Sequence, residues 1–278
     1  MAAESGRDPL VLVPGSLNSH IAEAYRILGA NITFGTTDEP VRSLGVLSAS
    51  HGEGKTSTAV NLGIIVAQAG YRVVIVDADL RGPSLHRAMA PIRPVDGRDP
   101  PAGLSSAVLG SAEVGDIVRS TVFDRLTYVP AGPISSNPGQ LIVSPRMREV
   151  VDELVQMADY VILDTPSLLA YADGLVIARI VDAVIYVVRA GIQDRAAQQR
   201  VHNQLTQARI RVLGVVFNDV VVEDGGGGYD YTPHPPNRAD EALPRRSAHS
   251  LPGSPISPLR STGASTRRSD REPLKPGE

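Results

Sequence analysis

The sequence Leu44-Gly-Val-Leu-Ser-Ala-Ser-His-Gly-Glu-Gly-Lys-Thr-Ser-Thr-Ala-Val-Asn61 contains a strand, a turn and the start of a helix. The apolar run 44–47 predicts a buried strand, and the segment 58–68 predicts a helix. The glycine-rich turn between them leads into a helix N-terminus, where unpaired backbone N–H groups and the helix dipole bind phosphates. Glycine lets the backbone approach such a ligand closely. The candidate phosphate-binding residues are therefore Gly52, Glu53, Gly54, Lys55, Thr56 and Ser57.

Two side chains in this turn have the chemistry of a nucleotide site. Lys55 can reach the terminal phosphates, and the hydroxyl of Thr56 suits Mg²⁺. One position departs from the general P-loop pattern, because Ala49 stands where a glycine is expected. Taken alone, the stretch also fits a cluster of loop glycines before a surface helix.

The composition limits the class of protein. The chain has 278 residues, a net charge of −3 and no cysteine. This length fits one α/β domain with an additional segment. The charge gives no reason to expect a nucleic-acid partner, and the lack of cysteine excludes disulfides, iron–sulfur sites and thiol chemistry. There is no secretory signal and no run of roughly 18–20 apolar residues that could span a bilayer, so we expect a soluble protein.

Apolar runs and helical periodicities alternate from residue 44 to residue 218, which predicts an α/β fold with a doubly wound, mostly parallel sheet. The expected strands are 44–47, 72–77, 126–130, 160–164, 183–188 and 212–217. The expected helices are 20–34, 58–68, 145–157, 172–179 and 194–208, with short helical pieces at 84–89 and 104–109.

The chain divides by composition into four parts. Residues 1–17 are expected to be irregular, and residues 18–222 to form the P-loop domain. Residues 223–232 are a glycine-rich hinge with two tyrosines. Residues 233–278 contain nine prolines and few large apolar residues, so we expect this tail to be disordered.

Two of the expected strands end in an acid, Asp77 and Asp164. Ligands bind at the carboxyl edge of such sheets, so both acids should lie beside the P-loop strand. With Thr56 and the phosphates they would hold Mg²⁺. Asp79, two residues beyond Asp77, could reach the attacking hydroxyl. From spacing alone, a capping acid and a surface ion pair remain a less favoured alternative for Asp79 and Arg81.

These motifs resemble the bacterial tyrosine kinases of capsule and exopolysaccharide synthesis, P-loop proteins related to cell-division-site and partitioning ATPases. The resemblance covers about residues 18–222. It rests on Glu23-Ala-Tyr-Arg26, the P-loop, and Val-Val-Ile-Val-Asp77-Ala-Asp79-Leu-Arg81. It continues with Asn137-Pro-Gly-Gln-Leu141, Val-Ile-Leu-Asp164-Thr-Pro and Leu213-Gly-Val-Val-Phe-Asn218.

The resemblance implies an ATP- and Mg²⁺-dependent protein-tyrosine autokinase that regulates polysaccharide synthesis or export. Its catalytic residues would be Lys55, Asp77, Asp79 and Arg81, with Thr56, Asp77 and Asp164 at the metal and Asn218 at the adenine. Tyr229 and Tyr231 would be the phosphate acceptors, and Glu23 and Arg26 would dock each subunit onto its neighbour in a homo-oligomer.

The resemblance also implies partners and a location. A transmembrane adaptor of the polysaccharide-copolymerase type would activate the kinase and recruit it from the cytoplasm to the inner face of the membrane. Two departures from the family pattern bear on this. Gly29 stands where the docking helix has a second arginine, and only two tyrosines remain of the acceptor cluster, which could also be linker aromatics without a role.

Two other functions stay open. The first is a dimeric ATPase switch of the partitioning or septum-positioning type, although Ser50 and His51 stand where those proteins carry an extra lysine. The second is a scaffold subunit that binds ATP without catalysis.

Overall fold

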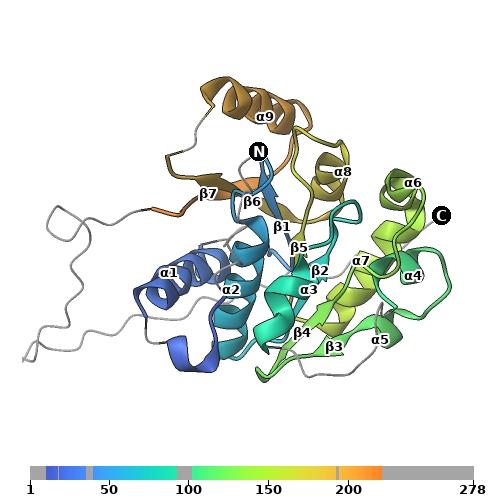
Figure 1. Cartoon of the computed structure of the whole chain (residues 1–278), viewed down its shortest axis with the longest axis horizontal. Helices are drawn as coiled ribbons and strands as arrows, with labels where there is room; N and C mark the ends of the chain where they lie inside the picture. Colours follow the sequence, from blue (N-terminus) through green and yellow to red (C-terminus); the bar gives the residue numbers. More distant parts are fainter. Residues whose placement is uncertain (1–10, 18, 36–39, 93–101, 192–193, 221–278) are drawn as a thin grey trace, which may run out of the picture. The chain divides into compact units, whose positions relative to one another are not determined.

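The computed structural model describes residues 11–17, 19–35, 40–92, 102–191 and 194–220. These lie in one compact unit, Met1–Glu223. Its centre is a seven-stranded sheet in the order β3-β4-β2-β5-β1-β6-β7, in which only the β3–β4 pair is antiparallel (Figure 1). The mostly parallel, doubly wound sheet predicted from the sequence is confirmed. The strands are β1 Ser43–Ser48, β2 Val73–Asp77, β3 Arg119–Ser120, β4 Leu126–Val129, β5 Tyr160–Asp164, β6 Ala183–Arg189 and β7 Val212–Asn218.

Helices cover both faces of this sheet, which explains why the inner strands are apolar throughout. The helices are α1 His20–Phe34, α2 Lys55–Gln68, α3 Leu85–Met89, α4 Leu104–Val108, α5 Val114–Ile117, α6 Pro138–Val143, α7 Pro145–Met157, α8 Asp173–Ile180 and α9 Arg195–Gln207, with short 3₁₀ turns η1 Pro14–Ser16 and η2 Ala90–Ile92.

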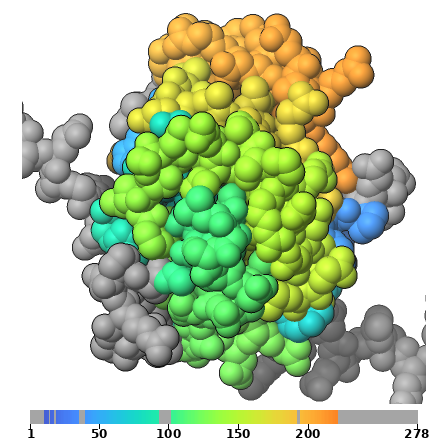
Figure 2. All heavy atoms as spheres, turned by 90° about the vertical axis from the view of Figure 1, so that its right-hand side faces the viewer, coloured from blue at the N-terminus to red at the C-terminus, as the bar shows by residue number. Residues whose placement is uncertain are grey.

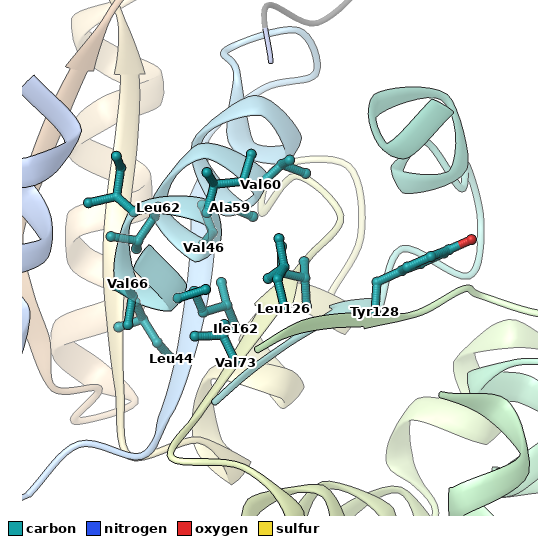
Figure 3. Close-up of a cluster of buried hydrophobic side chains, with 14 of the residues drawn as sticks. Leu44, Val46, Ala59, Val60, Leu62, Val66, Val73, Leu126, Tyr128 and Ile162 are labelled. Carbon is teal, nitrogen blue, oxygen red and sulfur yellow. The ribbon is translucent and has the colours of Figure 1, made fainter. Parts of the chain in front are cut away.

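One face of the sheet packs against α1, α2 and α3. Leu44 of β1 and Ile162 of β5 belong to the same buried cluster as Leu62 and Val66 of α2 (Figure 3). Leu44 and Leu62 are no more than 2% exposed. Burying such a side chain stabilises the fold by roughly 1.5–3 kcal/mol. This packing anchors α2 directly behind the turn that begins it.

The other face packs against α4–α9. Alternate residues of the same strands, such as Val74 of β2 and Leu163 of β5, share a buried cluster with Val150 and Leu154 of α7, while Tyr186 and Val188 of β6 share one with residues of α9. Figure 2 shows the outer surface of this layer, in which the green to yellow segments α4–α8 adjoin the orange α9.

The helix ends follow from local sequence. Ser19 caps α1 by accepting a hydrogen bond from the N–H of Ala22 (3.2 Å). Ser144 caps α7 in the same way, and Pro145 occupies its first turn. The predicted bounds of α1 and α7 are confirmed. The P-loop helix was expected from residue 58 but begins at Lys55, and β3, α5 and α6 were not predicted.

Candidate nucleotide and phosphoryl-transfer site

The candidate site residues meet at the carboxyl edge of β1, β5 and β2. In the parallel register Asp77 pairs directly with Asp164, and Asp164 pairs with Val46 of the P-loop strand. The expectation that both acids lie on strands beside β1 is half wrong. The strand of Asp164 is the neighbour of β1, whereas the strand of Asp77 lies one position further out, beyond β5.

The turn before α2 is built on two glycines with positive φ, Gly52 (78°) and Gly54 (96°). A Cβ at Gly54 would lie 1.9 Å from the side-chain nitrogen of Asn218, so this position also requires glycine for space. Ala49 is not among the described residues with positive φ, which explains why a non-glycine residue is accepted there. The expected phosphate-binding turn thus has the backbone freedom that such turns use.

Two side chains stabilise this turn through hydrogen bonds to its backbone. The amide nitrogen of Asn218 donates to the carbonyl of Glu53 (3.0 Å). The Glu53 carboxylate is buried and accepts from the N–H of Ser50 (3.0 Å). Asn218, expected at the adenine, therefore also ties the end of β7 to the P-loop.

Lys55 is a buried cation at the first residue of α2. It is 7% exposed, and its Nζ donates to Ser48 Oγ (2.9 Å). Burial lowers the pKa of its ammonium group, and the negative charges of Asp164, Asp79 and Glu53 partly offset this by raising the pKa. A polyphosphate beside Nζ would supply the opposite charge that favours the protonated lysine.

Thr56 lies between the acid at the end of β5 and a serine that sequence reasoning missed. Its Oγ1 donates to Asp164 Oδ2 (2.6 Å) and lies 2.8 Å from Ser84 Oγ. Asp77 Oδ2 accepts from the N–H of Leu85 (3.0 Å). Ser84 precedes α3, and the sequence carried no signal for it because a serine before a helix is ordinarily only a cap.

Each of the two acids has one oxygen without a partner. Asp77 Oδ1 and Asp164 Oδ1 are buried and have no hydrogen-bond partner among the described residues. An unpaired buried carboxylate oxygen is costly, and hard cations such as Mg²⁺ bind oxygen ligands of this kind. Since Mg²⁺ keeps several waters, Thr56, Asp77 and Asp164 fit it without a full protein cage.

Burial and nearby negative charge disfavour the charged forms of these acids. Desolvation raises the pKa of Asp164 to about 6, against an opposing hydrogen bond from Thr56 and the charge of Lys55. The pKa of Asp77 is raised well above its ordinary value, first by desolvation and then by the charge of Asp164. A divalent cation would reverse both effects by favouring the ionised carboxylates.

Asp79 and Arg81 line a cavity of about 280 Å³ in front of the P-loop, with Tyr171 among the other lining residues. Asp79 Oδ1 accepts from the N–H groups of Arg81 (3.2 Å) and Gly82 (2.9 Å), which fixes the turn after β2. The guanidinium of Arg81 contacts Asp173 and the ring of Tyr171. Neither of these partners was predicted from the sequence.

The remaining predicted residues lie elsewhere. Glu23 and Arg26 form an exposed ion pair on α1 (2.7 Å). Gly29 of the same helix is buried, and a Cβ there would lie 3.5 Å from Ile65 of α2. The structure therefore does not bring the docking-helix residues into the site. Tyr229 and Tyr231 lie outside the described residues.

Comparison with known proteins identifies the same kind of nucleotide-binding domain. Residues 44–228 match the CobQ/CobB/MinD/ParA nucleotide binding domain. The chain is 34% identical over 205 residues to the tyrosine-protein kinase YwqD of Bacillus subtilis, covering 74% of this chain and 82% of that protein. The chain belongs to the bacterial tyrosine-kinase family. The predictions of this family, of a P-loop ATPase-type fold and of a tyrosine kinase are confirmed.

Solved structures of related proteins superpose on this bacterial tyrosine kinase. The chimerical protein CapA2B2 superposes with a TM-score of 0.68 at 30% identity, over 76% of this chain and 93% of that one. The cell-division ATPase MinD of Pyrococcus furiosus superposes with a TM-score of 0.53 at 25% identity, over 63% and 71% of the two chains. The relation to septum-site ATPases that the motifs suggested is therefore present as well.

In the part of this kinase that the structure describes, no helix is long and apolar enough to cross a membrane. The same residues contain no group of three or more acidic or histidine side chains that could hold a metal.

Proposed function

We propose that this bacterial tyrosine kinase binds ATP with Mg²⁺ at the P-loop and transfers the γ-phosphoryl group to tyrosine, with Tyr229 and Tyr231 of another copy as acceptors. The observation that carries the proposal is the pair of unpartnered buried oxygens of Asp77 and Asp164 beside Thr56. Unpartnered buried carboxylate oxygens are costly in the protein alone, and at this edge of a P-loop fold they would serve as oxygen ligands for a metal–nucleotide complex.

In the transfer step, the tyrosine oxygen forms the new P–O bond, and the bond between the γ-phosphorus and the β–γ bridging oxygen breaks to leave ADP. Asp79 accepts the phenolic proton. Lys55 neutralises charge on the phosphates, and Mg²⁺ bound by Thr56, Asp77 and Asp164 would add charge neutralisation. The protein's contribution is positioning and electrostatic stabilisation, for which a rigid sheet edge is suited.

Assembly and regulation are part of the same proposal. Glu23 and Arg26 are exposed on α1, where a neighbouring subunit can reach them. Phosphate on Tyr229 and Tyr231 would add negative charge beside Glu223, Asp224 and Asp230, and this repulsion would release the tail from the neighbour. We expect a membrane-spanning adaptor to bring the kinase to the inner face of the membrane and to stimulate it.

The test is a transfer assay with radiolabelled ATP and Mg²⁺, with and without a cytoplasmic peptide from a candidate adaptor. Lys55→Met and the double variant Tyr229→Phe/Tyr231→Phe are the informative controls. Label on tyrosine in the wild type, lost in both variants, is the expected result. Residual label in the double variant would move the acceptor sites elsewhere in the chain.

The MinD-type relationship supports a second candidate, an ATPase switch. Released phosphate without any protein label would establish that function in place of the kinase. ATP binding with neither product would identify a nucleotide-bound scaffold. The same assay therefore separates all three.

A further inference from the structure

Arg81 is held on three sides by residues from other elements. Its Nε donates to Asp173 Oδ2 (2.6 Å) and a terminal nitrogen donates to Asp173 Oδ1 (3.2 Å), a bidentate ion pair. Its guanidinium carbon lies 4.3 Å from the centroid of the Tyr171 ring. A Cβ at Gly139 would lie 3.1 Å from a terminal nitrogen of Arg81. We call Asp173, Tyr171 and Gly139 the arginine clamp.

The clamp is a better-defined interaction than a surface ion pair. The side chain of Asp173 is only 10% exposed, and that of Arg81 is 32% exposed. Bidentate geometry and a cation–π contact each restrict a long side chain that would otherwise rotate freely. Asp173 is the first residue of α8, where the helix dipole further favours its negative charge.

Gly139 explains a motif that the transfer chemistry leaves without a role. It is the third residue of Asn137-Pro-Gly-Gln-Leu141 and belongs to the first turn of α6. A side chain there would press on the Arg81 guanidinium and, at 3.9 Å, touch Asp173. Glycine lets α6 approach the ion pair closely and close the third side of the clamp.

The clamp is connected to the candidate catalytic acid, Asp79, through the backbone of Arg81. The backbone N–H groups of Arg81 and Gly82 donate to Asp79 Oδ1, so the position of the arginine backbone orients the carboxylate. Asp79, Arg81 and Tyr171 also line the same cavity in front of the P-loop. A change in the clamp is therefore transmitted to Asp79 through two hydrogen bonds.

We propose that Asp173, Tyr171 and Gly139 are positioning residues that fix Arg81 and, through its backbone, hold the Asp79 carboxylate in place for phosphoryl transfer. They act without touching the nucleotide. The inference rests on the proposed transfer function, and it predicts a loss in the transfer step with nucleotide affinity retained.

Hydrogen–deuterium exchange tests the clamp independently of activity. Asp173→Asn removes the charge at nearly constant volume, and Tyr171→Leu removes the ring face. In both full-length variants we expect the amides of Arg81 and Gly82 to exchange at least about tenfold faster. Tyr171→Phe keeps the ring and should stay close to wild type in this measurement.

Asp159→Asn is the matched control, because Asp159 forms a similar ion pair with Arg72 (2.8 Å) just before β5, at the opposite edge of the sheet. Faster exchange at the Arg81 and Gly82 amides in this control would mean that losing any ion pair destabilises the whole domain. That result would overturn the proposal that the clamp positions Arg81. So would unchanged exchange in both Asp173→Asn and Tyr171→Leu. Tyr171 is 44% exposed, so its truncation is not expected to unfold the protein even if Asp173→Asn does.

Kinetics give the functional half of the test. Displacing a catalytic group by about 1 Å can cost roughly a hundredfold in rate, so we expect kcat for labelling of a tyrosine peptide to fall about 10- to 100-fold in Asp173→Asn and Tyr171→Leu. The Kd for ATP should stay within about twofold. Equal losses in kcat and ATP affinity would overturn the positioning role. A wild-type protein that labels no tyrosine, while the exchange pattern is as expected, would refute the proposed function and leave the clamp intact.

Discussion

Asp164 is buried next to another acid, and this has a measurable consequence for the protein without Mg²⁺. Its pKa is raised from 3.8 to about 6 by burial, so the folded state favours the protonated carboxyl. The stability that this proton gives is complete below about pH 4 and is lost as the pH rises through about 6.

Asp164→Asn should therefore stabilise the metal-free protein at pH 7.5, by up to roughly 3 kcal/mol, because the neutral amide avoids a buried charge. Near pH 4.5 the difference should fall to roughly 1 kcal/mol, since the carboxyl is then protonated in the folded wild type and the remaining difference comes from its partial ionisation in the unfolded chain. Thermal unfolding at both pH values in EDTA measures this. A variant that is less stable than wild type at both pH values would contradict the prediction.

Gly54 combines a positive φ with a lack of space, whereas Gly52 has a positive φ and nothing within 4 Å of the position that a Cβ would occupy. Gly54→Ala should destabilise the nucleotide-free protein more than Gly52→Ala does. The second change costs only the left-handed strain, roughly 1–2 kcal/mol, while the first also displaces Asn218. Unfolding in urea gives both free energies, and equal losses would rule out the contact with Asn218 as a determinant.

At the scale of elements, α1 shows why one family position differs here. Glu23 and Arg26 point outward, but Gly29 faces α2, where its Cβ position lies 3.5–3.9 Å from Ile65, Val66 and Leu62. The third position of the expected docking motif thus serves helix packing in this chain. An arginine there would have to leave this apolar contact.

Gly29→Ala should stabilise the protein by about 1 kcal/mol, because alanine favours the helix and its methyl group fits at ordinary contact distance. This corresponds to a rise of roughly 2–4 °C in the thermal midpoint. Gly29→Arg is the contrasting variant and should lower the midpoint, since its charged end cannot be buried against α2. An alanine variant with a lower midpoint would show that the helices cannot accept the methyl group.

At the scale of the whole chain, the domain boundaries remain a prediction from composition. A truncated chain that ends at residue 232 should keep the thermal midpoint and ATP affinity of the full chain, because the proline-rich residues 233–278 contain few large apolar side chains to bury. Calorimetry and nucleotide titration of the two proteins make the comparison. A midpoint several degrees lower in the truncated chain would mean that the tail packs on the domain.

The sequence by itself determined the class of fold, six of the seven strands and the position of the candidate phosphate-binding turn. Buried parallel strands are apolar throughout, so each can be predicted from its own residues. Gly52, Gly54 and Lys55 lie within four residues of one another, so the turn can be predicted without knowing which other segments contact it. The starts of α1 and α7 could be predicted because a helix start depends on neighbours in sequence, and the structure shows that Ser19 and Ser144 cap them.

Only the tertiary structure decided which strand lies next to which, and therefore that Asp77 pairs with Asp164 while β5 separates it from the P-loop strand. It also brought Arg81 to Asp173, 92 residues away in the chain, and placed Gly29 against α2. Contacts of this kind depend on crossover connections and on side chains packing through space. A single sequence contains the residues that form such a contact but does not show that they come together in the fold.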